Sequence, residues 1–340
     1  MPAFSILVAT YNHEKFIKGC IQSVIGQTFP GWEMIILDDG STDNTGSICR
    51  EWAAADPRIQ YIYQSNKGIL RLFETNNHGL EISKGKYISI LEGDDFWEKD
   101  KLQKQFDALE SHPEVVLCWG RVRAFASESG KTHSIVPAFG EKIPESWSNN
   151  PTGIILNDLC YDNFIPAVTI SIRKSTLIEI GGFRHFEGYP TTDYPTILKL
   201  ACRGPFYFCD DIIAAYRIHS NQITKVMSIQ LLEKRTFNIH RFIESLPGDL
   251  KSRLTVDSES IEKHFKNTRL ITYVVSGRHK LIRKDFADAR KDFKKAVFCK
   301  AGLLPAWRLS AMTGIIFSLF HADMEGLLQA FGKTGYKALI

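Results

Sequence analysis

The chain has 340 residues, a formal net charge of +4, 44% hydrophobic residues and 24% charged residues. This length exceeds a typical single domain and indicates one large α/β domain with an appendage, and the apolar content is sufficient for a substantial core. No run of about 18 uncharged apolar residues occurs, which excludes a membrane-spanning helix on sequence grounds.

The cysteines and the N-terminus indicate the compartment. Seven cysteines are scattered along the chain, and the odd count contains no CxxC pair. Most of them lie in apolar surroundings, so we predict reduced core thiols in a cytosolic protein. The first residues lead directly into an apolar run without a basic n-region, so we expect no signal peptide. Together these features predict a cytoplasmic location.

Charge is distributed unevenly between the two parts of the chain. From Lys225 to the end there are 21 Lys and Arg against 11 Asp and Glu, which leaves 21 against 27 for the remainder. An acidic front and a basic rear indicate two modules that face different partners. We therefore predict a first domain over residues 1–224 and a mainly helical extension over residues 225–340.

Apolar runs alternate with amphipathic stretches through the first third of the chain. The pattern predicts strands at residues 4–9, 33–37, 58–64 and 87–91 and helices at residues 13–27, 44–54, 70–82 and 99–111. This β-α order with short connections is typical of a parallel sheet with right-handed crossovers.

The pattern changes after a further predicted strand at residues 115–119. Residues 126–163 are rich in Ser, Pro, Gly and Asn, and we interpret them as a long excursion that forms a lid or a substrate-shaping loop. Regular structure then returns, with Asp210 and Asp211 expected in a turn between two strands, where a structural role is favoured. The predicted elements are strands at 169–172, 206–208 and 213–218 and helices at 175–180 and 194–202.

Two clusters of carboxylates follow predicted strands. Asp38, Asp39 and Asp43 come after one strand, and residues 92–95 supply Glu, Asp and Asp after another. The carboxyl ends of parallel strands meet at one edge, where ligands bind. Crowded carboxylates repel one another unless a cation lies among them, and a divalent ion shared with phosphate oxygens fits this need. The alternative is a solvated acidic turn that caps the next helix, and a second cluster at the same edge makes that alternative weaker.

Six short segments together resemble the family 2 glycosyltransferases, which have the GT-A fold. They are residues 5–12 (SILVATYN), 38–43 (DDGSTD), 91–95 (LEGDD), 181–183 (GGF), 192–194 (TDY) and 216–219 (YRIH). Each segment is weak alone, but the set in this order and spacing is specific. The resemblance covers about residues 3–224 and leaves the C-terminal third outside it.

The resemblance implies a fold and an activity. The fold is an α/β, Rossmann-like mixed and mostly parallel sheet with helices on both faces, to which this chain adds a C-terminal helical extension. The activity is inverting transfer of a sugar from a nucleotide-diphosphate donor, a UDP-sugar above all, to a hydroxyl of a glycan or lipid-linked acceptor in cell-surface polysaccharide biosynthesis. The implied cofactor is a divalent metal, Mn²⁺ or Mg²⁺.

The family pattern also assigns roles to residues of this chain. Asp39 should accept a hydrogen bond from the nucleobase with Asp38 supporting it, and Asp193 matches the catalytic base. Arg71 follows the third strand, where it could meet phosphates or the nucleobase, although surface solvation is the simpler role. The nucleotide-sugar set is Ala9, Thr10, Tyr11, Asp38, Asp39, Arg71, Asp94 and Arg217.

The metal site implied by the resemblance lies in the second acidic cluster. Asp94 and Asp95 match the metal-binding motif, whereas Glu92 stands where many members carry Asp. His219, with Arg217, matches a late loop that approaches the diphosphate or the metal, so His219 is a further candidate ligand. Asp193 lies on a different element from this cluster, as attack from the face opposite the diphosphate requires.

Two other functions and two interpretations of the C-terminal third stay open. A nucleotidyltransferase would need a Gly-rich basic loop after the first strand, and a non-catalytic nucleotide-sugar binder would tolerate loss of the key aspartates, which are present. The C-terminal helices, expected at 229–245, 258–275 and 284–298 with an apolar stretch at 303–320, form either a hairpin packed on the first domain or a basic amphipathic surface on the inner face of an anionic membrane. No motif indicates nucleic acid as a partner.

Overall fold

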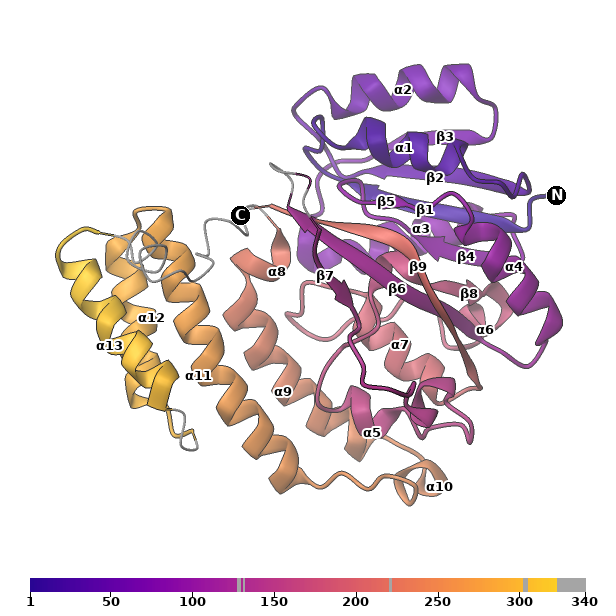
Figure 1. Cartoon of the computed structure of the whole chain (residues 1–340). Helices are drawn as coiled ribbons and strands as arrows, with labels where there is room; N and C mark the ends of the chain where they lie inside the picture. The colour runs from indigo at the N-terminus through magenta and orange to yellow at the C-terminus, as the bar shows by residue number, and fades with distance from the viewer. Residues whose placement is uncertain (127–129, 131, 220–221, 302–304, 323–340) are drawn as a thin grey trace. The chain divides into compact units, whose positions relative to one another are not determined.

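Four parallel strands form one half of the sheet in the computed structural model, which describes residues 1–126, 130, 132–219, 222–301 and 305–322. Strand β1 (Phe4–Thr10) pairs with β2 (Trp32–Asp38) and β4 (Tyr87–Ile90), and β2 pairs with β3 (Ile59–Tyr63). The strands are parallel, as the β-α alternation predicts (Figure 1). Their carboxyl ends therefore share one edge.

Helices cover both faces of these strands because the strand side chains alternate in direction. Ile6 and Val8 belong to the core beneath α1 (Ile17–Ile25) and α4 (Lys101–Ser111). Leu7 points the other way, toward Gly79 of helix α3. The remaining helices of residues 1–217 are α2 (Thr45–Ala55), α3 (Leu72–Ile82), α5 (Leu156–Leu159), α6 (Lys174–Glu179) and α7 (Asp193–Ala201).

Antiparallel strands complete the sheet. In the described residues its order is β3-β2-β1-β4-β8-β6-β9-β5, and β7 pairs with β6. Strand β8 is antiparallel to both β4 and β6, so the predicted α/β fold with a mixed sheet is confirmed. The added strands are β5 (Phe96–Trp97), β6 (Leu117–Ala126), β7 (Thr132–Val136), β8 (Ser171–Arg173) and β9 (Phe206–Ile218).

One local prediction is wrong. The two strands expected at residues 206–208 and 213–218 are a single strand, β9, so Asp210 and Asp211 lie within a strand and not in a turn. Both carboxylates are exposed and form ion pairs, Asp210 with Arg121 at 3.2 Å and Asp211 with Lys104 at 3.1 Å. Because these cations neutralise the pair, the strand continues through it. The structural role favoured for both aspartates fits these contacts.

The expected excursion contains short regular elements. Strand β7, a 3₁₀ turn (Glu145–Ser148) and α5 lie within residues 126–163, of which 127–129 and 131 are outside the described residues. The buried Asn149 anchors this segment, since its Nδ2 donates to the carbonyl oxygens of Ala201 at 2.9 Å and Gly204 at 2.8 Å. The lid role remains a prediction.

The chain divides into two compact units. The first comprises Met1–Phe125, Thr132–Arg217 and Pro247–Leu254, which includes α10 (Gly248–Lys251). The second comprises Ala126–Lys131, Ile218–Leu246 and Thr255–Ile340, and we call it the helical unit. The predicted boundary between residues 224 and 225 remains a prediction.

The helical unit has its own core. Phe293 of α12 is fully buried, and a Cβ added at Gly277 or Gly314 would collide with its ring. The two glycines therefore let three helices approach closely. Its helices are α8 (Ile223–Val226), α9 (Ser228–Glu244), α11 (Ser258–Ile282), α12 (Phe286–Phe298) and α13 (Pro305–Leu319). None of the described helices is long and apolar enough to cross a membrane.

All seven cysteines are free thiols, and five of them are buried. Burial raises the pKa of the Cys49 and Cys160 thiols to about 12, so both are protonated at neutral pH. The prediction of reduced core thiols is confirmed.

Candidate active site

The loops after β1 and β2 are held together by hydrogen bonds at the carboxyl edge of the sheet. Asn12 Oδ1 accepts from Thr42 N at 2.8 Å, and its own N–H donates to Ser41 Oγ at 2.9 Å. Asp38 is fully buried; its Oδ1 accepts from Ser41 N at 2.8 Å and its Oδ2 accepts from Tyr61 OH at 2.7 Å. Through these two hydrogen bonds the carboxylate of Asp38 fixes residues 38–43, which we call the first acidic loop.

Asp39 connects this loop to the segment after β3. Its Oδ1 accepts from Gln64 Nε2 at 2.7 Å and from Lys67 N at 2.9 Å, and its Oδ2 accepts from Gly68 N at 3.1 Å. An ionised carboxylate offers about four acceptor sites. Three are used within the protein, so one remains for a ligand N–H.

Residues 92–95, which we call the second acidic loop, pack directly against the end of β1. Gly93 N donates to Ala9 O at 3.3 Å, and a Cβ on Gly93 would lie 2.6 Å from His13 Nδ1 and 2.7 Å from Thr10 Oγ1. Only glycine fits at this approach, which explains the glycine inside the acidic motif. The contact brings Ala9 and Thr10 beside the carboxylates of residues 92–95.

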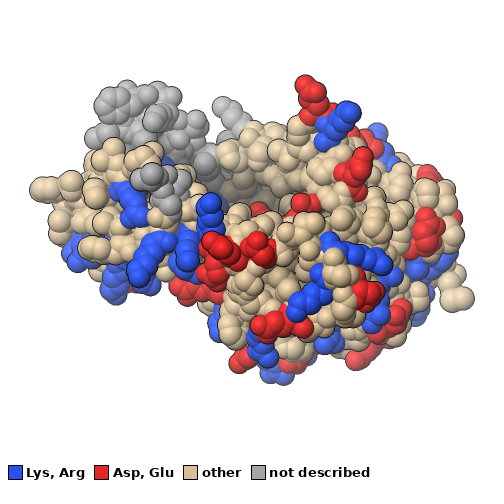
Figure 2. All heavy atoms as spheres, turned by 90° about the horizontal axis from the view of Figure 1, so that it is seen from below, with Lys and Arg blue, Asp and Glu red and all other residues tan. Residues whose placement is uncertain are grey.

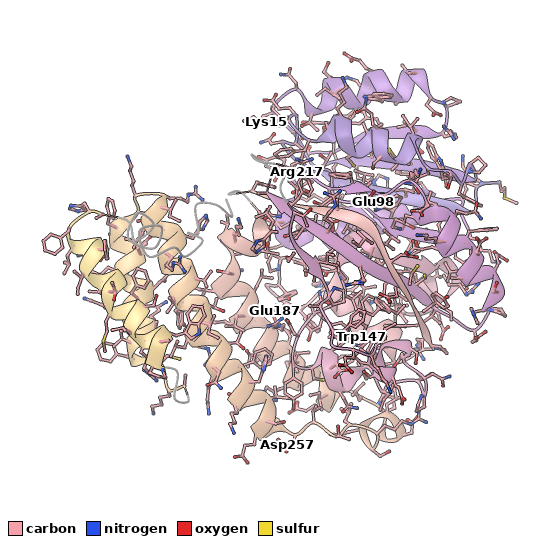
Figure 3. The ribbon with its side chains drawn as sticks, in the orientation of Figure 1. Lys15, Glu98, Trp147, Glu187, Arg217 and Asp257 are labelled. Atoms are coloured by element: carbon pink, nitrogen blue, oxygen red, sulfur yellow. The ribbon has the colours of Figure 1, made fainter. Side chains whose placement is uncertain are left out.

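Arg217 lies near the end of β9 (Figure 3), and its hydrogen bonds hold the second acidic loop. Its N–H donates to Asp95 Oδ1 at 2.8 Å, and its Nε donates to the carbonyl oxygen of Asp94 at 2.8 Å. Its guanidinium lies 4.8 Å from the ring centroids of Phe16 and Phe125. Burial lowers the pKa of Arg217, against the opposing effect of the charges of Asp95 and Asp94.

The carboxylates of this loop are crowded. Burial, followed by the charges of Asp94 and Glu92, raises the pKa of Asp95 well above its usual range. Burial, followed by the charges of Asp94 and Asp193, raises the pKa of Glu92 to about 8. Glu92 Oε2 is enclosed and has no hydrogen-bond partner among the described residues.

Asp193 begins helix α7, where the helix dipole favours a carboxylate. Asn163 Nδ2 donates to Asp193 Oδ2 at 2.8 Å, while Asn163 Oδ1 is enclosed and has no partner among the described residues. The preceding residue, Thr192, accepts at Oγ1 from Asn76 Nδ2 at 3.0 Å. Asn163 and Asn76 were not found from the sequence, because neither lies in a motif and each meets its partner only through the fold.

Most of the predicted site residues meet at one edge of the sheet. Arg71 is in an exposed two-point ion pair with Glu74, with Nε 2.6 Å from Oε1. Tyr11 is 47% exposed. His219 belongs to the helical unit, where its N–H donates to Gln222 Oε1 at 3.2 Å. The residues joined by contacts at this edge are Ala9, Thr10, Asp38, Asp39, Asp94, Asp95 and Arg217, while Asp193 begins α7 with its carboxylate bonded to Asn163.

No preformed metal cage exists within the described part of the chain. No group of three or more His, Cys, Asp or Glu side chains in those residues is arranged to hold an ion. The crowded carboxylates nevertheless fit a cation that takes one or two protein ligands and completes its shell with phosphate oxygens. The sequence prediction of Asp94 and Asp95 is compatible with that manner of binding.

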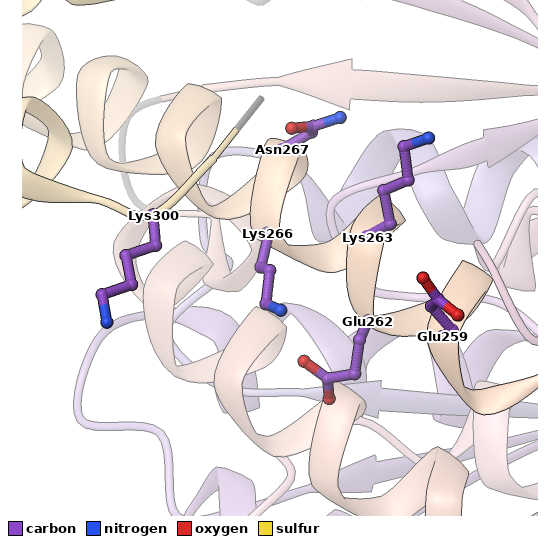
Figure 4. Close-up of a pocket in the computed structure, with 6 residues that line it drawn as sticks. All are labelled: Glu259, Glu262, Lys263, Lys266, Asn267 and Lys300. Carbon is purple, nitrogen blue, oxygen red and sulfur yellow. The ribbon is translucent and has the colours of Figure 1, made fainter. Parts of the chain in front are cut away.

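Two surface hollows lie at other residues. One of about 240 Å³ is lined by both signs of charge on the helical unit, from Glu259 to Lys300 (Figure 4). The other, of about 530 Å³, is lined by aromatic side chains that include Trp147 and Tyr207. Neither contains a residue of the sheet-edge site.

Comparison with known proteins identifies the family. The profile of glycosyl transferase family 2 matches residues 5–180, about half of the chain. This chain belongs to glycosyl transferase family 2. The matched residues contain both acidic loops and Asn163.

A relative and two solved structures agree with this family membership. The chain is 28% identical over 247 residues to TuaG of Bacillus subtilis, a glycosyltransferase provisionally assigned to teichuronic acid biosynthesis. The alignment covers 72% of this chain and 90% of TuaG. S. aureus TarS 1-349 in complex with UDP-GlcNAc aligns with a TM-score of 0.56 at 16% identity, over 98% of this chain and 93% of TarS. The mannosyltransferase PcManGT of Pyrobaculum calidifontis, solved with GDP-Man and Mn²⁺, aligns with a TM-score of 0.55 at 18% identity, over 93% of this chain and 80% of PcManGT. These likenesses confirm the GT-A fold of this family 2 glycosyltransferase.

Proposed function

We propose that this glycosyltransferase moves a sugar from a nucleotide-diphosphate donor, preferentially a UDP-sugar, to a hydroxyl of a glycan or lipid-linked acceptor, with inversion. The assignment of TuaG to teichuronic acid biosynthesis and the UDP-GlcNAc bound to TarS support a role in surface polysaccharide assembly. The observation that carries the proposal is the packing of the second acidic loop on the end of β1, where Gly93 N donates to Ala9 O and Arg217 N donates to Asp95 Oδ1.

Asp193 is the proposed base. The acceptor oxygen bonds to the anomeric carbon while the bond from that carbon to the diphosphate oxygen breaks, and the acceptor proton moves to Asp193. The nucleoside diphosphate leaves with the bonding electrons. Asn163 holds Asp193 Oδ2 at 2.8 Å, so the other carboxylate oxygen is the one directed to the acceptor.

Asp94 and Asp95 are the proposed ligands of Mn²⁺ or Mg²⁺. Mutual repulsion and the unpartnered Glu92 Oε2 support a site that a cation would stabilise. A bound divalent ion supplies electrostatic stabilisation of the leaving diphosphate. Arg217, anchored on the same loop, adds positive charge near Asp94 and Asp95. His219 is proposed as a further ligand of the ion.

Asp39 and Asp38 are proposed to form the nucleobase end of the site. Asp39 retains one acceptor position after its three bonds to residues 64–68, which suits the imino N–H of a uracil ring. Ala9, Thr10 and Tyr11 border the same place. Arg71 could contribute only by leaving its ion pair with Glu74.

The proposal is tested by turnover with defined donors. Purified protein is incubated with UDP-GlcNAc, UDP-glucose or GDP-mannose and Mn²⁺, with saccharide acceptors, and release of nucleoside diphosphate is measured together with the anomeric configuration of the product. We expect a UDP-sugar to be consumed and the configuration to invert. A product of retained configuration would contradict the role of Asp193, and consumption of GDP-mannose alone would contradict the UDP preference.

A further inference from the structure

The outward face of α13 carries large apolar side chains that the helical unit leaves exposed. Leu309, Met312, Ile316 and Leu319 recur at three- and four-residue intervals, and their exposed fractions are 65%, 50%, 54% and 56%. This spacing places all four on one side of the helix. Phe320, directly after the helix, is 78% exposed. A surface helix ordinarily presents polar side chains to water, so this face requires an apolar partner.

The opposite face of α13 fixes how the helix is oriented. Gly314 and Ser318 are buried against the unit's core. Arg308 NH1 donates to the carbonyl oxygen of Val297 at 2.6 Å, and Arg290 NH2 donates to the carbonyl oxygen of Ser318 at 3.0 Å. Both ends of α13 are thus bound to α12, and the apolar side cannot turn inward without breaking these bonds.

The helical unit also carries exposed basic residues and one more exposed ring at the end of α12. Phe298 is 81% exposed near the end of α12, and the exposed Lys294 lies one turn before it. Lys300 follows α12 and is also exposed. Residues 258–322 contain 13 Lys and Arg against five Asp and Glu. Figure 2 shows Lys and Arg side chains gathered on the visible face of the helical unit.

We propose that the apolar face of α13 docks the helical unit on an anionic lipid surface, with the exposed lysines of the unit adding electrostatic attraction. A helix of 15 residues is about 22 Å long, too short to cross a hydrocarbon core of about 30 Å, so α13 lies in the interface plane. Lipid tails receive the apolar side chains and anionic headgroups receive the lysines. A second copy of the chain would bring the same lysines together, which charge repulsion disfavours.

The inference deepens the proposed function, because a lipid-linked acceptor is found at such a surface. Only this link to the acceptor rests on the proposed function. Binding to lipid is measured without donor or turnover. A failure of the docking face therefore leaves the sugar-transfer proposal untouched, and a failure of sugar transfer leaves the docking face untouched.

The test is co-sedimentation of the full chain with vesicles. Vesicles of equal parts phosphatidylglycerol and phosphatidylcholine are compared with vesicles of phosphatidylcholine alone. We expect binding to the anionic vesicles that weakens as salt is raised. The double variant Leu309→Gln/Ile316→Gln should lower the partition coefficient at least tenfold, because the apolar contribution is lost. Lys294→Glu/Lys300→Glu should lower it on the order of tenfold on anionic vesicles only.

Ile178→Gln is the matched control, since Ile178 is 56% exposed on a different element. It should bind vesicles like the unchanged protein, and circular dichroism of every variant verifies that the helices are intact. Absence of binding to anionic vesicles by folded protein would overturn the inference. So would a self-association, measured by sedimentation velocity, that Leu309→Gln/Ile316→Gln abolishes while vesicle binding is unaffected.

Discussion

The two acidic loops at the sheet edge carry the same kind of side chain in opposite surroundings. In the loop after β2, the carboxylates of Asp38 and Asp39 accept hydrogen bonds from neutral donors of the protein. In the loop after β4, Glu92 and Asp95 face other carboxylates, and burial together with that repulsion raises the pKa of both. The first loop keeps one acceptor position on Asp39 for a ligand, whereas the crowding of carboxylates in the second fits the cation proposed above.

This difference suggests a division of labour along the edge. A loop with satisfied carboxylates is rigid and suits shape recognition of a nucleobase. A loop with crowded carboxylates is costly to keep ionised and suits a cation and a diphosphate.

Replacing the proposed base should have the largest effect. In Asp193→Asn we expect kcat to fall by about 10²–10⁴-fold, because proton removal from the acceptor is lost, with little change in donor affinity. Turnover and calorimetric donor binding are measured side by side. Asp249→Asn, at an exposed carboxylate in the first turn of α10, serves as the control. Unchanged turnover in Asp193→Asn would remove Asp193 as the base.

Lys101 tests the same principle with a cation. Burial disfavours the charged form, which raises the pKa of a carboxyl group but lowers the pKa of an amine. Lys101 is fully buried; its Nζ lies 3.9 Å from the Trp97 ring centroid and donates to Gln105 Oε1 at 2.5 Å. Burial lowers the pKa of Lys101 to about 7. Between pH 7 and the unfolded value of about 10.4 the unfolded chain binds more protons, so stability rises with pH across this window and the penalty is complete below it.

Lys101→Met should therefore be more stable than the unchanged protein below pH 7, by about 1–4 kcal/mol. Ser171 Oγ still donates to Gln105 Oε1 at 2.6 Å, so the variant leaves that acceptor partnered. Urea unfolding at pH 6 and pH 10 measures the difference, which should shrink at the higher pH. An advantage that grows with pH would contradict the prediction.

Isosteric changes in the two acidic loops should differ in sign. In Asp38→Asn the side-chain NH₂ faces one of two donors, Ser41 N or Tyr61 OH, so one hydrogen bond is lost. This should lower the free energy of unfolding by about 1–3 kcal/mol. Asp95→Asn keeps an oxygen for Arg217 N and removes repulsion, so the ligand-free protein should be as stable as before or more stable. Thermal unfolding of both variants checks this. Equal destabilisation by the two would remove the contrast.

The smallest expected effect concerns the support of the base. Asn163→Ala removes the hydrogen bond to Asp193 Oδ2, and we expect kcat to fall on the order of tenfold with donor affinity unchanged. A purely structural role would instead lower thermal stability without this split. The variant Asn163→Ser, whose hydroxyl is also a donor, should lose less if the bond orients the carboxylate.

Much of the edge could be predicted because it depends on local pattern. Buried parallel strands must end where charge begins, so Asp38 and Asp95 were placed at one edge from alternation alone. Asn163 could not be found, because it belongs to no motif and its partner Asp193 lies 30 residues further along the chain, beyond β8 and α6. The continuity of β9 through Asp210 and Asp211 was missed because their cationic partners come from distant elements.

Calorimetric titration of the protein with UDP and with uridine, each with and without Mn²⁺, tests the contrast most directly. If the second acidic loop is completed by a cation and a diphosphate, Mn²⁺ should strengthen UDP binding by on the order of 100-fold and leave uridine binding unchanged. Equal affinity for UDP with and without Mn²⁺ would contradict the account, as would an equal gain for uridine.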